Sequence, residues 1–329
     1  MEQQTPRQRR FGFRRGAGRR PRGIAVRPRA LVGAACAAVL AVALAAGFLS
    51  AAEGRTLTAA TGQSAASPAA GGSDPASSGL EASAEASAAV SAPAAGTVDA
   101  ALDARIQAIL DANSQYQIGV ALMDVSSGAD PAEVHEYGVR EDFVAASTAK
   151  VLAAAAYYHL VETGAASLDD PLGAYTAGFQ LREMIQQSDN DSWSLIMDAV
   201  GHSELTAYAA SIGVDYDPEI NTLTPADMAR ILSGVYSGTL LDAEDTAELL
   251  SYMQDTNYET LIPAAVPDGI TVFHKYGLLN AELHDAGILA RDGTAYALVI
   301  YTKGQDLSDV PERTEVIHQL TQAVADALF

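Results

Sequence analysis

The stretch Phe143-Val-Ala-Ala-Ser147-Thr-Ala-Lys150 places a serine three residues before a lysine, where an apolar run from Val151 to Val161 begins. The run predicts a helix, and positions i and i+3 of a helix share one face, so we expect the Ser147 hydroxyl beside the Lys150 amine. Serine becomes a nucleophile when a neighbouring base takes its proton, and a buried lysine near positive charge can be that base. Serine at a helix start can also cap a backbone N–H, so this spacing alone leaves both roles open.

Charge divides the chain into two unequal parts. Residues 1–52 carry ten arginines and one acid, a net charge of +9, whereas the other 277 residues carry ten basic and forty acidic side chains, a net charge of −30. Averaging them to the overall −21 would hide this division. The acidic part argues against nucleic acid as a partner, because nucleic-acid binding needs a basic surface.

The N-terminal part predicts a membrane segment. Residues 1–29 form a basic tail, and residues 30–52 form a run of 23 residues without a charge, long enough to cross a bilayer. Arginines before the run predict a cytoplasmic tail and an external remainder, which is a single-pass protein of the cell membrane. The alternative is a signal peptide cleaved at Ser50-Ala51-Ala52, which would give a secreted protein. A twin-arginine signal at Arg9-Arg10 fits poorly, since the apolar run starts about twenty residues later.

Residues 53–96 consist mainly of Ala, Ser, Gly and Pro and predict a disordered linker, because they offer too little apolar surface for a core. Residues 97–329 remain as a catalytic domain. The single cysteine, Cys36, lies in the apolar run, and the six histidines form neither H-x-H nor H-E-x-x-H. We therefore expect no disulfide, no metal and no cofactor in the domain, which is predicted to be a monomer.

Apolar patterns predict strands near both ends of the domain and helices between them. Strands are expected at 116–125, 133–139, 271–275, 285–290 and 294–301, and helices at 98–112, 151–161, 191–200, 203–212, from Thr224, from Asp242 to about Met253, and 312–328. Short links make the late strands antiparallel. The expected fold class is α/β of the α+β type, with an antiparallel five-stranded sheet flanked by the terminal helices, and an all-helical lobe.

Three short motifs follow one another in this domain: Ser147-x-x-Lys150, Ser188-Asp189-Asn190 and Lys275-Tyr276-Gly277. Singly they are weak, since Ser188-Asp189-Asn190 could be a helix-capping loop and Lys275 a surface charge. However, the chain has only three lysines, at 150, 275 and 303, and two of them fall in the motifs. A random scatter of charge would not be expected to give that placement.

Together the motifs resemble the serine β-lactamase and penicillin-binding protein superfamily, whose signatures are S-x-x-K, S-D-N and K-T-G. The resemblance covers about residues 97–329 and is strongest to class A β-lactamases. Three stretches carry it further: Ser188-Asp-Asn-Asp-Ser-Trp193, Thr224-Pro-Ala-Asp-Met-Ala229 and His284-Asp-Ala-Gly-Ile288. It implies a β-lactamase/transpeptidase-like fold and acyl-enzyme chemistry.

The resemblance implies four catalytic residues. Ser147 would attack a carbonyl and become acylated, and Lys150 would accept its proton. Ser188 would relay that proton toward the leaving nitrogen. Lys275 would add positive charge near the substrate carboxylate and depress the pKa of its neighbours.

Substrate-binding residues follow from the same resemblance. Asn190 would hold the amide side chain of the substrate, and Gly277 would let the strand backbone approach it. The backbone N–H groups of Ser147 and Leu278 would form the oxyanion hole. His284 and Asp285 are interpreted as structural.

Three departures from the family pattern put the substrate and the turnover in question. The segment between the Lys150 helix and Ser188 is short, and Tyr276 stands where Thr or Ser is usual. The stretch Tyr216-Asp-Pro-Glu-Ile-Asn221 resembles the E-P-E-L-N loop that supplies the deacylating glutamate, but aspartate stands first and most of the loop is missing. Asp217 has a shorter reach and could belong to an ordinary turn.

Three functional hypotheses remain. The first is an exported serine hydrolase of class A β-lactamase type, acting on β-lactams or related amides. The second is a D-Ala-D-Ala peptidase, like a penicillin-binding protein, acting on cell-wall peptides. The third is a binding or sensor domain of the same fold that has lost turnover.

Overall fold

The computed structural model describes residues 98–126 and 133–329. The predicted tail at 1–29, membrane segment at 30–52 and linker at 53–96 lie outside these residues and stay predictions. Within the described ranges, every helix is too short or too polar to cross a membrane.

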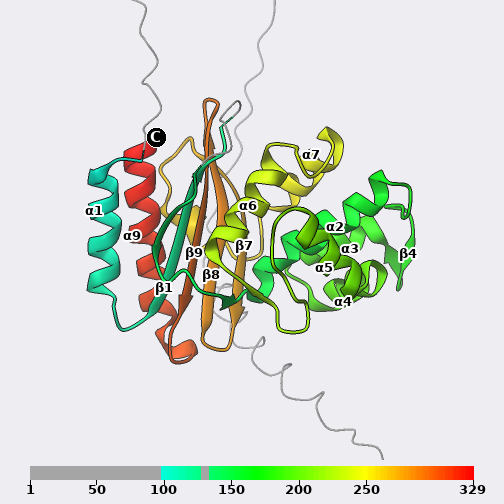
Figure 1. Cartoon of the computed structure of the whole chain (residues 1–329), viewed down its shortest axis with the longest axis horizontal. Helices are drawn as coiled ribbons and strands as arrows, with labels where there is room; N and C mark the ends of the chain where they lie inside the picture. The colour runs from blue at the N-terminus through cyan, green and yellow to red at the C-terminus, as the bar shows by residue number, and fades with distance from the viewer. Residues whose placement is uncertain (1–97, 127–132) are drawn as a thin grey trace, which may run out of the picture. The chain divides into compact units, whose positions relative to one another are not determined.

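A five-stranded antiparallel sheet forms the centre of the domain, as predicted (Figure 1). In spatial order its strands are β2 (His135–Gly138), β1 (Gln117–Asp124), β9 (Thr294–Lys303), β8 (Glu282–Arg291) and β7 (Thr271–Leu279). Tight turns join β7 to β8 and β8 to β9, which fixes their antiparallel register. The third-motif strand β7 therefore lies at one edge, and it extends past the predicted end at Lys275.

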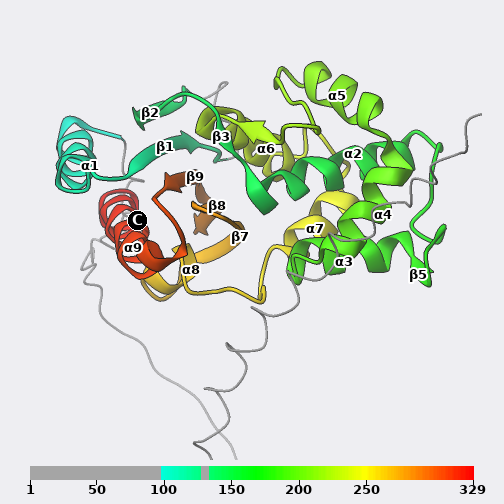
Figure 2. The ribbon, with the colours of Figure 1, turned by 90° about the horizontal axis from the view of Figure 1, so that it is seen from below.

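Strand β9 shows how both faces of the sheet are covered. Tyr296, Leu298 and Ile300 belong to the core shared with α1 (Ala100–Ala112) and α9 (Val310–Leu328). The alternating residues Ala297, Val299 and Tyr301 belong to the core on the opposite face. Successive strand residues point to opposite faces, so a nearly continuous apolar run suits a sheet covered on both sides. Figure 2 shows α1 and α9 on one side and α6 on the other.

The middle of the chain forms the predicted helical lobe. Its helices are α2 (Lys150–Glu162), α3 (Ala177–Gln186), α4 (Asn190–Val200), α5 (His202–Ser211), α6 (Pro225–Tyr236) and α7 (Ala243–Tyr252). Thr224 accepts a hydrogen bond from the Asp227 N–H and caps α6, and Asp242 caps α7 in the same way. Both caps are as predicted. Helix α3 was not predicted, although Thr176 caps it and Leu181, Met184 and Ile185 form its buried stripe.

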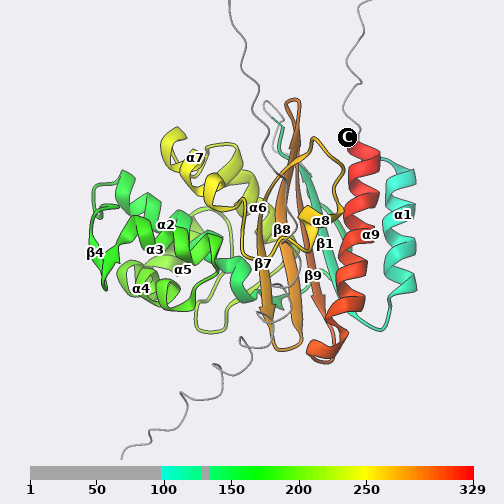
Figure 3. The same ribbon diagram turned by 180° about the vertical axis from the view of Figure 1, so that it is seen from behind.

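Smaller elements connect the lobe to the sheet. The pairs β3 (Phe143–Val144) with β6 (Thr222–Leu223), and β4 (Pro171–Leu172) with β5 (Tyr175–Thr176), are two-stranded. Short helices are η1 (Ala146–Ala149), α8 (Ile262–Ala265) and η2 (Leu307–Asp309). The β3–β6 pair brings residues near 220 next to the Ser147 turn. In Figure 3 the edge strand β7 is the strand nearest to the helical lobe, so the third motif lies where sheet and lobe meet.

Candidate active site

Ser147 lies in the 3-10 turn η1, and α2 begins at Lys150. Side chains at i and i+3 eclipse one another in a 3-10 helix, so the pair shares one face as the spacing predicted. Ala146 just before the serine has a positive φ of 50°, which is unfavourable for a residue with a Cβ. Asn221 supports this backbone: its carbonyl accepts from Ala145 N at 2.8 Å, and its Nδ2 donates to Ala146 O at 3.2 Å. Strain held by neighbouring contacts is typical of functional turns.

The Lys150 side chain reaches the second motif. Its Nζ donates to Asn190 Oδ1 and to the Ser188 carbonyl, each at 2.7 Å, and lies 3.3 Å from the Asp189 carbonyl. Among the described residues, its hydrogen bonds go to this motif and none to the Ser147 hydroxyl. Asn190 thus holds the lysine, a contact that the sequence did not predict.

The Ser188 hydroxyl lies between two amines. Lys275 Nζ donates to Ser188 Oγ at 2.8 Å, and Lys150 Nζ lies 3.5 Å from the same oxygen. Ser188 has a positive φ of 54°, and Asp189 beside it caps α4 through the Ser192 N–H at 2.7 Å. The loop therefore caps α4, as the structural alternative predicted, and also places the Ser188 hydroxyl between the two amines.

Burial changes the proton affinity of both lysines. Burial lowers the pKa of Lys150 to about 8, although the Asp189 carboxylate acts in the opposite direction. Burial, and then the charge of Lys150, lowers the pKa of Lys275 well below its ordinary value. If both amines beside this hydroxyl carried a proton, their positive charges would repel each other in a buried site. One neutral amine is therefore favoured near neutral pH. That is the condition for a lysine to act as a base.

Gly277 permits close packing of β7 against the nucleophile turn. A Cβ at this position would lie 3.1 Å from Ala145 O and 3.2 Å from both Ala146 Cβ and Thr148 Cγ2. A side chain would push the strand away from the turn. The predicted approach of this strand to a substrate stays a prediction. Leu278 follows it and is partly exposed, next to the same turn.

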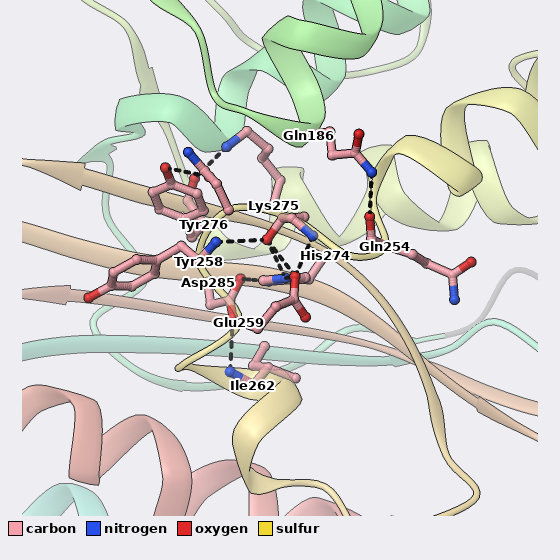
Figure 4. A network of polar contacts seen from close by, with 11 residues as sticks. Gln186, Gln254, Tyr258, Glu259, Ile262, His274, Lys275, Tyr276 and Asp285 are labelled. Atoms are coloured by element: carbon pink, nitrogen blue, oxygen red, sulfur yellow. Dashed lines mark hydrogen bonds and ion pairs between the residues drawn. The ribbon is translucent and has the colours of Figure 1, made fainter. Parts of the chain in front are cut away.

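A buried ionic network lies behind Lys275 on the same strand. His274 Nδ1 lies 2.9 Å from Asp285 Oδ1, and His274 Nε2 lies 3.2 Å from Glu259 Oε1 (Figure 4). Burial lowers the pKa of His274, but these two carboxylates outweigh it and raise the pKa to about 9. Asp285 also accepts from Ile262 N at 2.9 Å. The structural role predicted for Asp285 fits this position, and the network fixes the strand next to Lys275.

The segment that carries Glu259 also contacts the third motif. Tyr276 stacks on Tyr258 with ring centroids 4.8 Å apart, and its hydroxyl donates to Asn257 Oδ1 at 3.1 Å. Asn257 Nδ2 donates to the Gln187 carbonyl at 2.8 Å, directly before Ser188. Tyr276 therefore belongs to a chain of contacts between the third and second motifs. The sequence alone missed Asn257 and Tyr258, since no local motif marks them.

His284 has the structural role that the sequence predicted. Its Nε2 donates to Val144 O at 2.9 Å, and its Nδ1 accepts from Thr302 N at 3.1 Å. Burial lowers the pKa of His284 to about 4, so the ring is neutral at pH 7. The histidine ties β8 to β9 and to the segment before Ser147.

Asp217 forms an exposed turn. Its Oδ1 accepts from Glu219 N at 2.8 Å, and its carbonyl accepts from Asn221 N at 2.8 Å. Aspartate followed by proline commonly adopts such a turn. Asp217, which the resemblance offered as a candidate base, thus has a local structural use here.

Comparisons with known proteins agree with this arrangement. A β-lactamase of Proteus vulgaris is 28% identical over 252 residues, which is 64% of this chain and 90% of that protein. A solved mutant of PBP-A, described as an acyl-enzyme complex with penicillin G, is 26% identical with a TM-score of 0.62; 69% of this chain and 96% of that one are covered. A β-lactamase structure from Desulfarculus baarsii is 25% identical with a TM-score of 0.61, covering 70% and 98%.

A family model described as the β-lactamase enzyme family matches residues 101–328. This range spans all three motifs, the sheet and the helical lobe. The mixed fold, the order of the motifs and the matched range agree with one another. The chain therefore belongs to the β-lactamase enzyme family, within the serine β-lactamase and penicillin-binding protein superfamily.

Proposed function

We propose that this protein is a serine hydrolase that forms an acyl-enzyme on Ser147 with β-lactams or related amides and releases the acyl group slowly. The observation that carries the proposal is the Ser188 hydroxyl, which lies 2.8 Å from Lys275 Nζ and 3.5 Å from Lys150 Nζ. In this arrangement Lys150 can exchange a proton with the Ser188 hydroxyl, and that hydroxyl can donate a proton to the leaving nitrogen.

The reaction follows from these positions. Ser147 Oγ attacks the carbonyl carbon, and its proton passes to neutral Lys150 Nζ. When the C–N bond breaks, Ser188 gives its proton to the leaving nitrogen and is reprotonated from Lys150, which restores the base. Lys275 donates to Ser188 Oγ, and transfer of the Ser147 proton and binding of an anionic group of the substrate both act on its protonation: the substrate's negative charge favours the charged form of Lys275, which then attracts that group. The product is an ester of Ser147, which water must hydrolyse.

Slow release is proposed because the position of the family's base is occupied by Asp217, whose carboxylate is exposed and bonded to Glu219 N. General base catalysis is typically worth about 10²–10⁴-fold in rate, so its loss lengthens the life of the ester by that order.

A D-Ala-D-Ala peptidase is the second candidate, and the likeness to PBP-A favours it. Such an enzyme would also form an ester on a serine and would be trapped by penicillin. A sensor of the same fold would acylate but would not release D-alanine.

A labelling experiment tests the acylation itself. The full-length protein is treated with a fluorescent penicillin, and the labelled peptide is sequenced by mass spectrometry. The proposal expects the label on Ser147, and competition by unlabelled benzylpenicillin. A label elsewhere, or none, contradicts it. D-Ala release from a pentapeptide in a parallel assay would select the peptidase over the sensor.

We also propose that the catalytic domain is exported and tethered by residues 30–52, because the arginine-rich tail precedes a span without charge. Protease treatment of intact cells tests this. Cleavage within residues 53–96 should release a fragment that still binds penicillin. A full-length protein protected in intact cells would contradict the proposal.

A further inference from the structure

The Lys275 amine is covered by the protein itself, although Lys275 lies on the edge strand β7. Its side chain is fully buried. Its Nζ donates to Ser188 Oγ at 2.8 Å and to the Tyr276 carbonyl at 3.2 Å. A charged lysine amine has three N–H donors, so these two hydrogen bonds leave one for another partner.

The ring of Tyr276 takes the place of that third partner. Lys275 Nζ lies over the ring, 4.1 Å from its centroid, where the face of a tyrosine attracts a cation. In the part of the chain that the structure describes, the Lys275 amine therefore keeps no free N–H for a substrate carboxylate. We call the position beside this amine, where such a carboxylate would lie, the anion subsite.

Contacts with the segment before β7 hold the Tyr276 ring in place. The ring stacks on Tyr258 with centroids 4.8 Å apart, and the Tyr276 hydroxyl donates to Asn257 Oδ1 at 3.1 Å (Figure 4). Burial raises the pKa of Tyr276, although the Ser188 and Asn257 side chains beside its hydroxyl act in the opposite direction. The hydroxyl is therefore neutral at pH 7, and it donates its proton to Asn257 instead of to a substrate carboxylate.

The other amine of the site is also engaged. Lys150 Nζ donates to Asn190 Oδ1 and to the Ser188 carbonyl, each at 2.7 Å. Lys150 must also be neutral to accept the Ser147 proton, so it cannot hold a carboxylate by charge at the same time. Residues 53–329 carry a net charge of −30, which repels an anionic substrate as it approaches.

We propose that Tyr276 closes the anion subsite, and that this site prefers amides and esters whose leaving group carries no carboxylate. The inference rests on the proposed acylation of Ser147 and specifies the substrate class for it. In that step the bond from Ser147 Oγ to the carbonyl carbon forms and the bond to the leaving nitrogen or oxygen breaks. The leaving atom takes the proton of the Ser188 hydroxyl.

The closure slows acylation by anionic substrates without preventing it. A carboxylate beside the leaving atom reaches Lys275 only after the Tyr276 ring has left the amine and its stack on Tyr258. A neutral substrate needs no such movement, because it has no carboxylate to place in the anion subsite. Tyr276 is therefore a specificity-determining residue, which selects by the charge of the leaving group.

Two substrates that differ in this charge test the inference. Benzylpenicillin and its methyl ester present the same lactam bond, and intact-mass spectrometry of the full-length protein gives the rate constant of acylation by each. Wild type should react with the methyl ester at least as fast as with benzylpenicillin. A rate more than twofold higher for benzylpenicillin would overturn the inference and leave the acylation of Ser147 standing. No adduct with either compound would overturn the proposed function, and this inference with it.

Three variants locate the effect at the ring. Tyr276→Thr should raise the rate with benzylpenicillin about tenfold and change the rate with the methyl ester less than about twofold. Tyr276→Phe keeps the ring over Lys275 and should keep the wild-type ratio of the two rates. Tyr175→Thr, at an exposed tyrosine of β5, is the matched control and should also keep it.

An unchanged ratio in Tyr276→Thr, or an equal gain with both substrates, would overturn the closure by the ring. The wild-type ratio decides the inference if Tyr276→Thr fails to fold.

Discussion

The segments that hold Ser147 and Asp217 meet through the β3–β6 pair and through Asn221, whose carbonyl accepts from Ala145 N at 2.8 Å, yet they are built differently. Beside the Ser147 turn, Lys150 of α2 and Lys275 of β7 converge on the Ser188 loop in part-buried hydrogen bonds. Asp217, six residues after the end of α5 at Ser211, is exposed, and its hydrogen bonds among the described residues lie within its own turn. The residues that would form an ester are thus held by contacts between several elements. Asp217, which would have to activate the hydrolytic water, is held, among the described residues, only by its own turn.

Loss of the nucleophile should abolish acylation and so have the largest effect. Ser147→Ala removes the atom that forms the ester, so penicillin labelling should fall by several orders of magnitude. Intact-mass spectrometry measures the adduct directly. Ser203→Ala, an exposed serine on α5, should label like wild type, and an adduct on Ser147→Ala would show that another residue is acylated.

Loss of the base should have the next largest effect. Lys150→Met keeps the length and the apolar stem but removes the amine, and acylation should slow by about 10³-fold. Stopped-flow measurement of the acylation rate gives this value. Lys303→Met is the matched control, because that lysine is 45% exposed and pairs with Glu282 away from the site. An effect of less than tenfold in Lys150→Met would assign the base elsewhere.

Acylation should depend on pH through the same amine. Because burial lowers the pKa of Lys150 to about 8, the neutral base predominates above that pH and becomes scarce below it. The acylation rate should therefore rise with pH to a plateau above about 8 and be about 100-fold lower at pH 6. A flat rate between pH 6 and pH 9 would contradict a lysine base.

Replacement of Tyr276 by a residue with a small hydroxyl, as is usual in the family, should make acylation more efficient. Tyr276→Thr should raise the acylation efficiency toward benzylpenicillin about tenfold, since a hydrogen bond to a charged carboxylate is worth about 1.5–3 kcal/mol. It should also lower stability by about 1 kcal/mol through loss of the ring contact with Tyr258. Tyr276→Phe keeps the ring and should show no gain in rate. A gain in both variants would attribute the effect to the Asn257 hydrogen bond instead.

Asp217 should give the smallest effect. If its carboxylate serves only the local turn, Asp217→Asn should change the lifetime of the penicillin adduct less than about twofold, against about 10²–10⁴-fold for loss of a true base. The asparagine side chain can still accept from Glu219 N, so the turn is kept. A lifetime more than tenfold longer in this variant would make Asp217 the deacylating base.

The candidate site residues could be named because each motif is short and its residue types have a definite chemistry. Ser147, Lys150, Ser188 and Lys275 were named in this way as catalytic, and the structure brings the last three together. The sheet was predictable from short apolar runs bounded by turn residues, and the continuous burial of β9 shows that its run is covered on both faces. Helix α3 had the same kind of signal, a Thr176 cap and a buried stripe, but it was not predicted.

Other features depend on contacts between distant segments. Asn257 joins Tyr276 to the Ser188 loop, and Glu259 reaches His274, but neither lies in a recognisable motif. The positive φ angles of Ala146 and Ser188 oppose local preference and are held by tertiary contacts. Spacing along the chain cannot reveal such features, because the partners are chosen by the folded sheet and lobe.

The lifetime of the acyl-enzyme decides whether Ser147 forms an ester that the protein releases slowly. The full-length protein is acylated with benzylpenicillin, free drug is removed, and intact mass is followed with time. We expect a single adduct on wild type, absent from Ser147→Ala, that persists for hours. An adduct that decays within seconds to minutes, with steady hydrolysis of penicillin, would show that an efficient deacylating base exists and would contradict slow release.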